Sequence, residues 1–500
     1  MTVADRRATP RPSGPLATRL GAQLATARSS GARSRLISTT SPIDDLDPIA
    51  VFAAARALDL EAALWFQPGA GRSIVGIGRA WAVETAGTAR FSEATVAWRT
   101  VLANALRSGE SVATPAAGPI LLGGLGFSGR TPERDDSWAP FGAASLVLPT
   151  FGLVRDAAGS YLTVAVGPEE LDDVDPARLD HRWDSLRHAA QARGRDANPA
   201  GRSAGAAGRP PTPTLTEEGR HLRVIDERPD RADWDRTVGL FAGAVGRGRI
   251  DKVVLARRVM WRADAELDIE AALRHLARSA PESTTFAFVR DGTTFLGATP
   301  ERLVRTAGRL FETVAIAGSA ARGSDPDDDA RLAAALLASE KDREEHAVVV
   351  DMLRASLAPI STVLRVAETP AILPLRHVQH LVTSIAGTLR EDAGLLELGE
   401  RLHPTPAVGG APRQMALDLI AEHEGFDRGW YAGPIGWLGA DGHGELMVAL
   451  RCGLVRGTDA TAFAGCGIVA DSDPAGEWEE SRLKLRTMTG ALGGAVEDDR

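Results

Sequence analysis

Residues 231–492 carry strand-like and helix-like patterns in close succession, with no repeat of fixed period. The length of 500 residues alone suggests two or three domains, but a large enzyme built on mixed sheets can exceed that size as one unit. The elements we expect here are strands at 251–259, 445–455 and 462–469, a hairpin of 285–289 with 294–296 around Asp291-Gly292, and helices at 327–357 and 477–492.

The first 230 residues are less regular. Residues 50–63 have helical spacing, and 73–83 and 143–154 alternate as strands. Residues 1–35 are rich in arginine and small residues, which is typical of a disordered tail or, alternatively, of a transit peptide. Residues 192–214 have no periodicity and many glycine, alanine and proline residues, so they predict a flexible insertion.

Composition excludes several classes of protein. The net charge of -9 is unlike that of nucleic-acid-binding proteins, which usually present a basic face. The two cysteines, Cys452 and Cys466, form no CxxC pair, so neither a zinc site nor a disulfide framework is indicated. No apolar run approaches eighteen residues, and no membrane span is expected. A cytoplasmic protein is the natural expectation.

One glycine motif is misleading. Gly124-Leu-Gly126-Phe-Ser-Gly129 matches the spacing of a dinucleotide-binding loop, but such a loop opens a helix. A polar turn with Pro132 follows instead, so we expect a glycine-rich bend between two strands.

Lysine is scarce. Of 57 basic residues only Lys252, Lys341 and Lys484 are lysines. Lysine can lose its proton in suitable surroundings whereas arginine cannot, so these three are candidates for roles that arginine cannot fill. Lys252 lies on a predicted strand, where it is either a neutral general base or a charge that protects a sheet edge.

Two predicted helices present carboxylates on one face. Asp342 and Glu345 are three residues apart, as are Glu477 and Glu480, with Lys484 four residues further on. Two such helices can enclose Mg²⁺, which prefers oxygen ligands and takes one or two carboxylates directly. The alternative is an ordinary solvated helix face.

Other candidates also have structural explanations. Thr299-Pro300-Glu301 has the pattern of a helix start, with Glu301 near the positive helix end. The glycines of Gly465-Cys-Gly467 and Gly318-Ser319 let backbone N–H groups approach an anion, although a tight turn explains them equally well. His380 fits a catalytic group or a hydrogen-bonded core histidine.

Five blocks together resemble the chorismate-utilising enzymes over about residues 232–490, and the resemblance rests on their order and spacing. They are ATPERL (298–303), IAGSAARG (316–323), SEKDREEH (339–346), HPTPAVGG (403–410) and AGCGIVA (464–470) followed by EWEE (477–480). The resemblance implies an α+β fold, a single four-layer sandwich with two antiparallel sheets inside and helices outside. Residues 36–191 would then form its N-terminal half and 231–492 its chorismate-binding catalytic region.

The resemblance also implies roles for single residues. Lys252 matches the base that activates water, Glu301 the general acid, and His380 a histidine near the ring carboxylate. Glu345 and Glu480 match direct Mg²⁺ ligands, with Asp342 and Glu477 acting through water. The groups that hold the substrate carboxylates match Tyr431, Arg451, the backbone of Gly465 and Gly467, and Lys484.

Within the family, single positions favour one activity. Anthranilate synthases lack a lysine at the position of Lys252, and aminodeoxychorismate synthases have a nucleophilic lysine at the position of Ala317. The resemblance therefore implies a Mg²⁺-dependent isomerase that converts chorismate to isochorismate, for menaquinone, siderophore or salicylate synthesis, as a monomer without an amidotransferase subunit. Salicylate synthase is the alternative, but Ala407 replaces the threonine usual in those lyases. A non-catalytic relative is a third interpretation, although no catalytic residue is missing.

Overall fold

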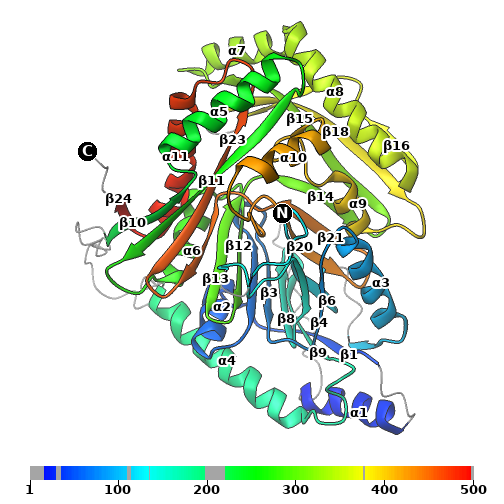
Figure 1. Cartoon of the computed structure of the whole chain (residues 1–500). Helices are drawn as coiled ribbons and strands as arrows, with labels where there is room; N and C mark the ends of the chain where they lie inside the picture. The colour runs from blue at the N-terminus through cyan, green and yellow to red at the C-terminus, as the bar shows by residue number, and fades with distance from the viewer. Residues whose placement is uncertain are drawn as a thin grey trace, which may run out of the picture.

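The computed structural model describes residues 16–29, 35–109, 114–133, 136–197, 220–374 and 378–496, which form two large sheets with helices around them (Figure 1). The first sheet has fourteen strands, in the order β24 (Gly494–Val496), β10 (Arg220–Arg228), β11 (Lys252–Ala263), β23 (Asp459–Ile468), β22 (Cys452–Arg456), β13 (Thr293–Thr299), β12 (Thr284–Arg290), β2 (Ala62–Gln67), β3 (Arg72–Ile77), β8 (Phe151–Asp156), β9 (Gly159–Val166), β1 (Ile37–Pro42) and β5 (Leu106–Gly109), with β19 (Gly410–Ala411) paired to β11.

The second sheet has ten strands, and almost all pairs in both sheets are antiparallel. Its order is β16 (Ser361–Val366), β18 (Val378–Leu389), β15 (Leu310–Ala321), β14 (Arg302–Ala307), β21 (Gly444–Val448), β20 (Pro434–Gly439), β6 (Ile120–Leu125), β7 (Ala144–Leu148) and β4 (Trp81–Thr85), with β17 (Ala371–Pro374) paired to β18.

Helices cover the outer faces of both sheets. They are α1 (Leu16–Ser29), α2 (Pro48–Ala57), α3 (Arg90–Ala103), α4 (Pro176–Ala197), α5 (Arg231–Gly246), α6 (Ile269–Ser279), α7 (Pro326–Ala338), α8 (Glu340–Leu357), α9 (Leu395–Leu402), α10 (Arg413–His423) and α11 (Pro474–Ala491). Helices α2, α6 and α11 pack on the first sheet, and α3, α8 and α9 on the second. The predicted α+β fold of antiparallel sheets is confirmed. Among the described helices, none is both long enough and apolar enough to cross a membrane.

Aromatic side chains from both sheets and from the loops between them fill the core. Trp138 packs edge-on against Phe295 of β13 at 5.0 Å, and Phe141 packs likewise against Trp430 at 5.3 Å. All four are buried, and such edge-to-face pairs add stability beyond the area that they bury. The core therefore joins the first sheet firmly to the loops that precede β7 and β20.

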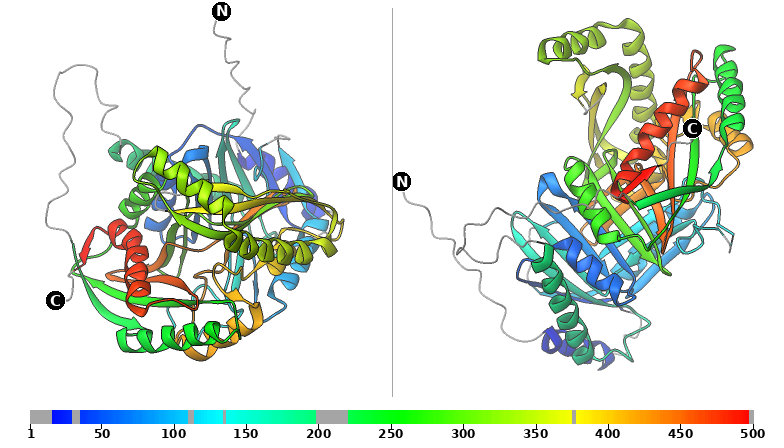
Figure 2. Two further views of the ribbon diagram at one scale, coloured as in Figure 1. Left: turned by 90° about the horizontal axis from the view of Figure 1, so that it is seen from above. Right: turned by 90° about the vertical axis from the view of Figure 1, so that its left-hand side faces the viewer.

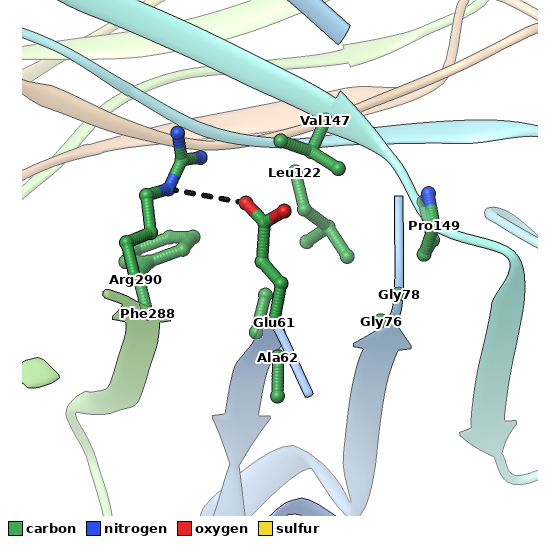
Figure 3. Close-up of a pocket in the computed structure, with 10 residues that line it drawn as sticks. Glu61, Ala62, Gly76, Gly78, Leu122, Val147, Pro149, Phe288 and Arg290 are labelled. Atoms are coloured by element: carbon green, nitrogen blue, oxygen red, sulfur yellow. Dashed lines mark ion pairs between the residues drawn. The ribbon is translucent and has the colours of Figure 1, made fainter. Parts of the chain in front are cut away.

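An ion pair between the buried Arg290 and the half-buried Glu61 lies between the two sheets, away from the residues that the sequence singled out. Figure 3 shows Glu61 and Arg290 facing one another in a cavity lined by Leu122 and Val147. Glu61 Oε1 and Arg290 Nε are 3.4 Å apart, and burial lowers the pKa of Arg290 to about 10. Because the guanidinium still carries its charge near neutral pH, Glu61 is needed to compensate it.

Several predicted elements are confirmed. The hairpin forms as β12 and β13, with Asp291 and Gly292 at φ 46° and 72°, as a two-residue hairpin turn requires. The strands predicted at 251–259 and 462–469 correspond to β11 and β23, and the last predicted helix to α11, which Asp473 caps. In the described residues between the glycine motif and β7 there is no helix, and Gly124 of the motif lies in β6 beneath the ring of Trp430.

Other predictions were wrong in ways that matter for the site. No helix begins at Thr299, because residues 300–301 connect β13 of the first sheet directly to β14 of the second. The single strand predicted at 445–455 is two strands, β21 and β22, again in different sheets. The helix predicted at 327–357 is interrupted at Ser339, which has extended backbone and caps α8 by accepting from Asp342 N.

The N-terminal predictions need similar corrections. Residues 16–29 of the expected disordered tail form α1, whose Leu20 and Leu24 are buried against the fold. The helix expected over 50–63 ends at Ala57, and the ranges 73–83 and 143–154 each contain two strands instead of one. The expected insertion at 192–214 begins inside α4, which continues to Ala197, and the remainder lies outside the described residues.

A second ion pair, in which both side chains are buried, anchors the loop between α9 and α10. Arg428 Nε donates to Glu424 at 2.6 Å, and its Nη1 and Nη2 atoms donate to the carbonyls of Val408 and Val254. Glu424 also accepts from the backbone N–H of Ala256 in β11. Both charged side chains are only 2 % exposed, so each depends on the other for compensation.

We expect Glu424→Ala to lower the free energy of unfolding by about 3–5 kcal/mol, because it leaves the Arg428 charge buried without a partner. Glu422→Ala is the matched control: its side chain is 72 % exposed, and we expect a change within about 0.5 kcal/mol. Urea unfolding measures both values. A loss for Glu424→Ala no larger than that of the control would contradict this role.

Candidate active site

Lys252 begins β11, and its side chain crosses the backbone of Gly467 in the neighbouring strand β23. A Cβ atom placed at Gly467 would overlap the Lys252 Cε atom and lie 3.0 Å from Nζ. The absence of a side chain at Gly467 therefore lets the Lys252 amine lie over the sheet. Lys252 is half-buried here, and it is paired through its backbone with Ala411 of β19.

Glu301 lies at the connection from the first sheet to the second. Its carbonyl accepts from Val448 N at 2.9 Å, and Thr299 Oγ1 donates to the Val448 carbonyl at 2.5 Å. Burial raises the pKa of the Glu301 carboxyl, the positive charges of Lys252 and Lys484 oppose this, and the result is about 7. The structure thus groups the two lysines around a carboxyl that can hold a proton near neutral pH.

His380 in β18 joins the same group. Its Nδ1 atom lies 2.7 Å from the hydroxyl of Ser319 in β15, within hydrogen-bonding distance. Burial lowers the pKa of His380, a backbone hydrogen bond at Gly318 raises it, and the charge of Lys252 lowers it further. Gly318 has φ 73° and lies at a register shift in β15. His380 is therefore a neutral group beside Lys252.

The predicted carboxylate-binding residues converge on β23 and α11. Lys484 Nζ donates to the Gly465 carbonyl at 2.6 Å and pairs with Glu480 Oε1 at the same distance. Tyr431 stacks on Phe463 at 5.1 Å, and its hydroxyl lies 2.9 Å from where a Gly465 Cβ would be. The glycine therefore leaves room for the tyrosine hydroxyl over the strand.

Arg451 lies at the second connection between the sheets. It has φ 50°, a left-handed conformation that is uncommon outside glycine, and its carbonyl accepts from Ala298 N at 3.2 Å. Burial lowers the pKa of its guanidinium, while the negative charge of Glu480 opposes that shift. The two connections, at 299–302 and 448–452, are thus hydrogen-bonded to one another and hold Glu301 and Arg451 in place.

A possible metal-binding group forms at the start of α11. Ligand atoms of Cys466, Glu477 and Glu480 all lie within 4.8 Å of one another. Burial raises the pKa of Glu477, a hydrogen bond from Ser472 lowers it, and the charge of Glu480 raises it. Burial also raises the pKa of Cys466 to about 12, so its sulfur is a protonated thiol, and it donates to the Glu477 carbonyl at 3.2 Å. The two carboxylates are therefore the oxygen donors of this group.

Asp342 and Glu345 lie on α8, which is drawn well apart from α11 in Figures 1 and 2. Asp342 accepts a hydrogen bond from the Ser339 hydroxyl, and Glu345 is exposed. His346 is also on α8, and its Nε2 atom lies 2.7 Å from the hydroxyl of Thr383 in β18. This contact joins α8 to the second sheet. Among the described residues, these two carboxylates are not members of the group formed with Cys466.

Ala407 is exposed in the loop between α9 and α10, and it lines a cavity together with Glu301. The structure therefore places Ala407 on the wall of the same cavity as Glu301. Cys466 and Thr405 also lie at this site, and no sequence pattern pointed to either side chain. Only the packing of α11 on β23 and of the 403–410 loop on β14 brings them there.

A family model described as "Chorismate binding enzyme" matches residues 22–493, and the chain belongs to this family. Among its relatives, the isochorismate synthase MenF of Bacillus subtilis (strain 168) is 35% identical over 92% of this chain and 94% of its own length. A salicylate biosynthesis isochorismate synthase of Pseudomonas aeruginosa is 38% identical, over 92% of this chain and 90% of that protein.

Solved structures agree with these relatives. The menaquinone-specific isochorismate synthase MenF from Escherichia coli has a TM-score of 0.67 and 26% identity, and the match covers 94% of this chain and 99% of that one. Component I of anthranilate synthase from Streptococcus pneumoniae, at 21% identity and a TM-score of 0.62, shares the fold. The family predicted from the sequence is therefore confirmed.

The path of Lys252 over Gly467 can be tested directly, because a chain with three lysines gives few signals after ¹³C-methylation of its amines. We expect Gly467→Ala to shift the NMR signal of Lys252, since the new methyl group displaces its side chain, and to leave the exposed Lys341 unchanged. Gly239→Ala is the control, because no heavy atom lies within 4 Å of its Cβ position. An unchanged Lys252 signal in Gly467→Ala would refute the placement.

Proposed function

We propose that this protein is an isochorismate synthase, which isomerises chorismate by adding water at C2 as the C4 hydroxyl leaves. The observation that carries the proposal is the grouping of Lys252 and Glu301, in which a carboxyl with a pKa raised to about 7 lies near an amine. Such a pair can supply a base and an acid at one pH. Two relatives that match over 92% of this chain carry this activity in their names.

In the proposed reaction, Lys252 first gives up the proton that makes it a positive charge near Glu301, and its amine then takes a proton from the attacking water as the C2–O bond forms. The double bond shifts, the C4–O bond breaks, and Glu301 gives its proton to the departing oxygen, which leaves as water. Atoms and charge balance, because one water enters and one leaves. The acid form of Glu301 predominates below pH 7 and is lost as the pH rises through that value.

Chorismate is a dianion, so its two carboxylates need fixed donors and positive charge. We assign this role to Arg451, Lys484, Tyr431 and the backbone of Gly465 and Gly467, which converge on β23. We place the ring beside His380, with Ser319 and Gly318 holding the imidazole. The small side chain of Ala407 leaves space beside Glu301.

The donor set fits Mg²⁺, and we propose it as the cofactor. Glu477 and Glu480 offer carboxylate oxygens, which hard divalent cations prefer, while the protonated thiol of Cys466 is a poor ligand for them. The resemblance adds Glu345 and Asp342 of α8 to the ligand set, although α8 lies apart from α11 in this structure. When bound, Mg²⁺ supplies positive charge that fixes and polarises a substrate carboxylate. We further propose that the enzyme acts in the cytoplasm as a monomer without an amidotransferase subunit.

Incubation of the protein with chorismate and Mg²⁺, followed by chromatography, tests the proposal. We expect isochorismate as the product; salicylate with pyruvate would indicate the alternative salicylate synthase, and unchanged chorismate a non-catalytic relative. Lys252→Ala should lower kcat by roughly 10²–10⁴-fold with little change in melting temperature, because it removes the base. Lys341→Ala, an exposed lysine, serves as control. Wild-type-like turnover in Lys252→Ala would refute the mechanism.

A further inference from the structure

The cavity beside Glu301 has room for water. It lies between β14, β15, α8 and the 402–407 loop, and most of its wall is aliphatic, including Leu303, Leu353 and Leu402. About 40 Å³ is open to the centres of water molecules, whereas one water needs roughly 10–15 Å³. A water molecule in this cavity can form hydrogen bonds only with the polar groups of the wall.

One hydroxyl in the wall has no partner. Thr405 Oγ1 is buried and makes no hydrogen bond with the described residues. The other polar groups of the wall are occupied: Thr313 donates to the Leu303 carbonyl at 2.7 Å, and Arg302 pairs with Glu312 at 3.3 Å. Because a buried hydroxyl without a partner is costly, Thr405 indicates a ligand that the cavity receives.

The backbone holds this hydroxyl in a fixed place. The Thr405 carbonyl accepts from Val408 N at 3.1 Å and from Gly409 N at 2.9 Å. Val408 is itself fixed, since its carbonyl accepts from the buried Arg428 at 2.8 Å. The loop therefore presents the Thr405 side chain from a rigid turn, as a preorganised group must be presented.

We propose that Thr405 holds the water molecule that leaves C4 of chorismate, in the cavity beside Glu301. This rests on the proposed function. As the C4–O bond breaks, its electron pair goes to the oxygen, Glu301 supplies the proton, and the new water begins in contact with the resulting carboxylate. Thr405 donates a hydrogen bond to the oxygen as its negative charge develops, so its effect falls on kcat more than on KM.

Thr405→Val and Thr405→Ser test the proposal in the full-length enzyme, with Mg²⁺ and chorismate. Valine keeps the shape and removes the hydroxyl, so we expect kcat to fall at least tenfold and KM to change less than threefold. The melting temperature should not fall, because the lost hydroxyl had no protein partner. Serine restores the hydroxyl, and kcat should return to within threefold of wild type.

Thr313→Val is the matched control, since it removes a hydroxyl from the same wall that already has a partner. It should lower the melting temperature and leave kcat within threefold. A smaller fall in kcat for Thr405→Val, a serine variant as slow as the valine variant, or an equal fall in Thr313→Val would overturn the assignment. Failure of the proposed function itself is distinguishable, because the wild-type protein would then form no isochorismate.

Discussion

The burial of the Glu301 carboxyl near the amines of Lys252 and Lys484 is the interaction on which the proposed chemistry depends. Burial alone would raise the pKa of the carboxyl further, and two positive charges without burial would lower it. The balance gives a pKa of about 7, at which a carboxyl can donate a proton to a leaving oxygen and regain it. The glutamate would not have this pKa if the lysines lay elsewhere in the fold.

The fold produces this balance through two connections between its sheets. The chain passes from the first sheet to the second at Glu301 and from the second to the first at Arg451, and backbone hydrogen bonds join the two connections. Side chains at such connections lie at the boundary between the two sheets instead of on one face. The loop that carries Thr405 and Ala407 also lies at the site, together with the two connections. The buried pair of Glu424 and Arg428 holds this loop in place.

The sequence predicted some of the elements that carry the candidate site residues better than it predicted the path of the backbone between the two sheets. The alternation of β11 and β23 and the cap of α11 are local features, so Lys252, Gly465, Gly467 and Glu480 could be placed on their elements in advance. Thr299-Pro300-Glu301 has a local pattern that fits a helix start equally well, and only its pairing with Val448, far along the chain, decides for a strand connection. Likewise, nothing local shows that 445–455 changes sheets at Arg451.

Long-range packing also explains what the sequence missed. Cys466 lies between two glycines that were chosen for their backbone, but its sulfur lies near Glu477 because α11 packs on β23. Thr405 has an unpartnered hydroxyl only because the surrounding side chains come from β14, β15 and α8. Conversely, Asp342 and Glu345 have the predicted helical spacing, but spacing on one helix does not determine its distance from another.

The protonation of Glu301 can be measured by ¹³C NMR titration of carboxyl-labelled protein, with Glu301→Gln to assign the signal. We expect a midpoint near pH 7 in the wild type and a higher midpoint in Lys252→Met, because the lysine charge lowers the pKa of the carboxyl. A midpoint near the ordinary value of 4.5, or one that does not respond to the loss of Lys252, would contradict this expectation.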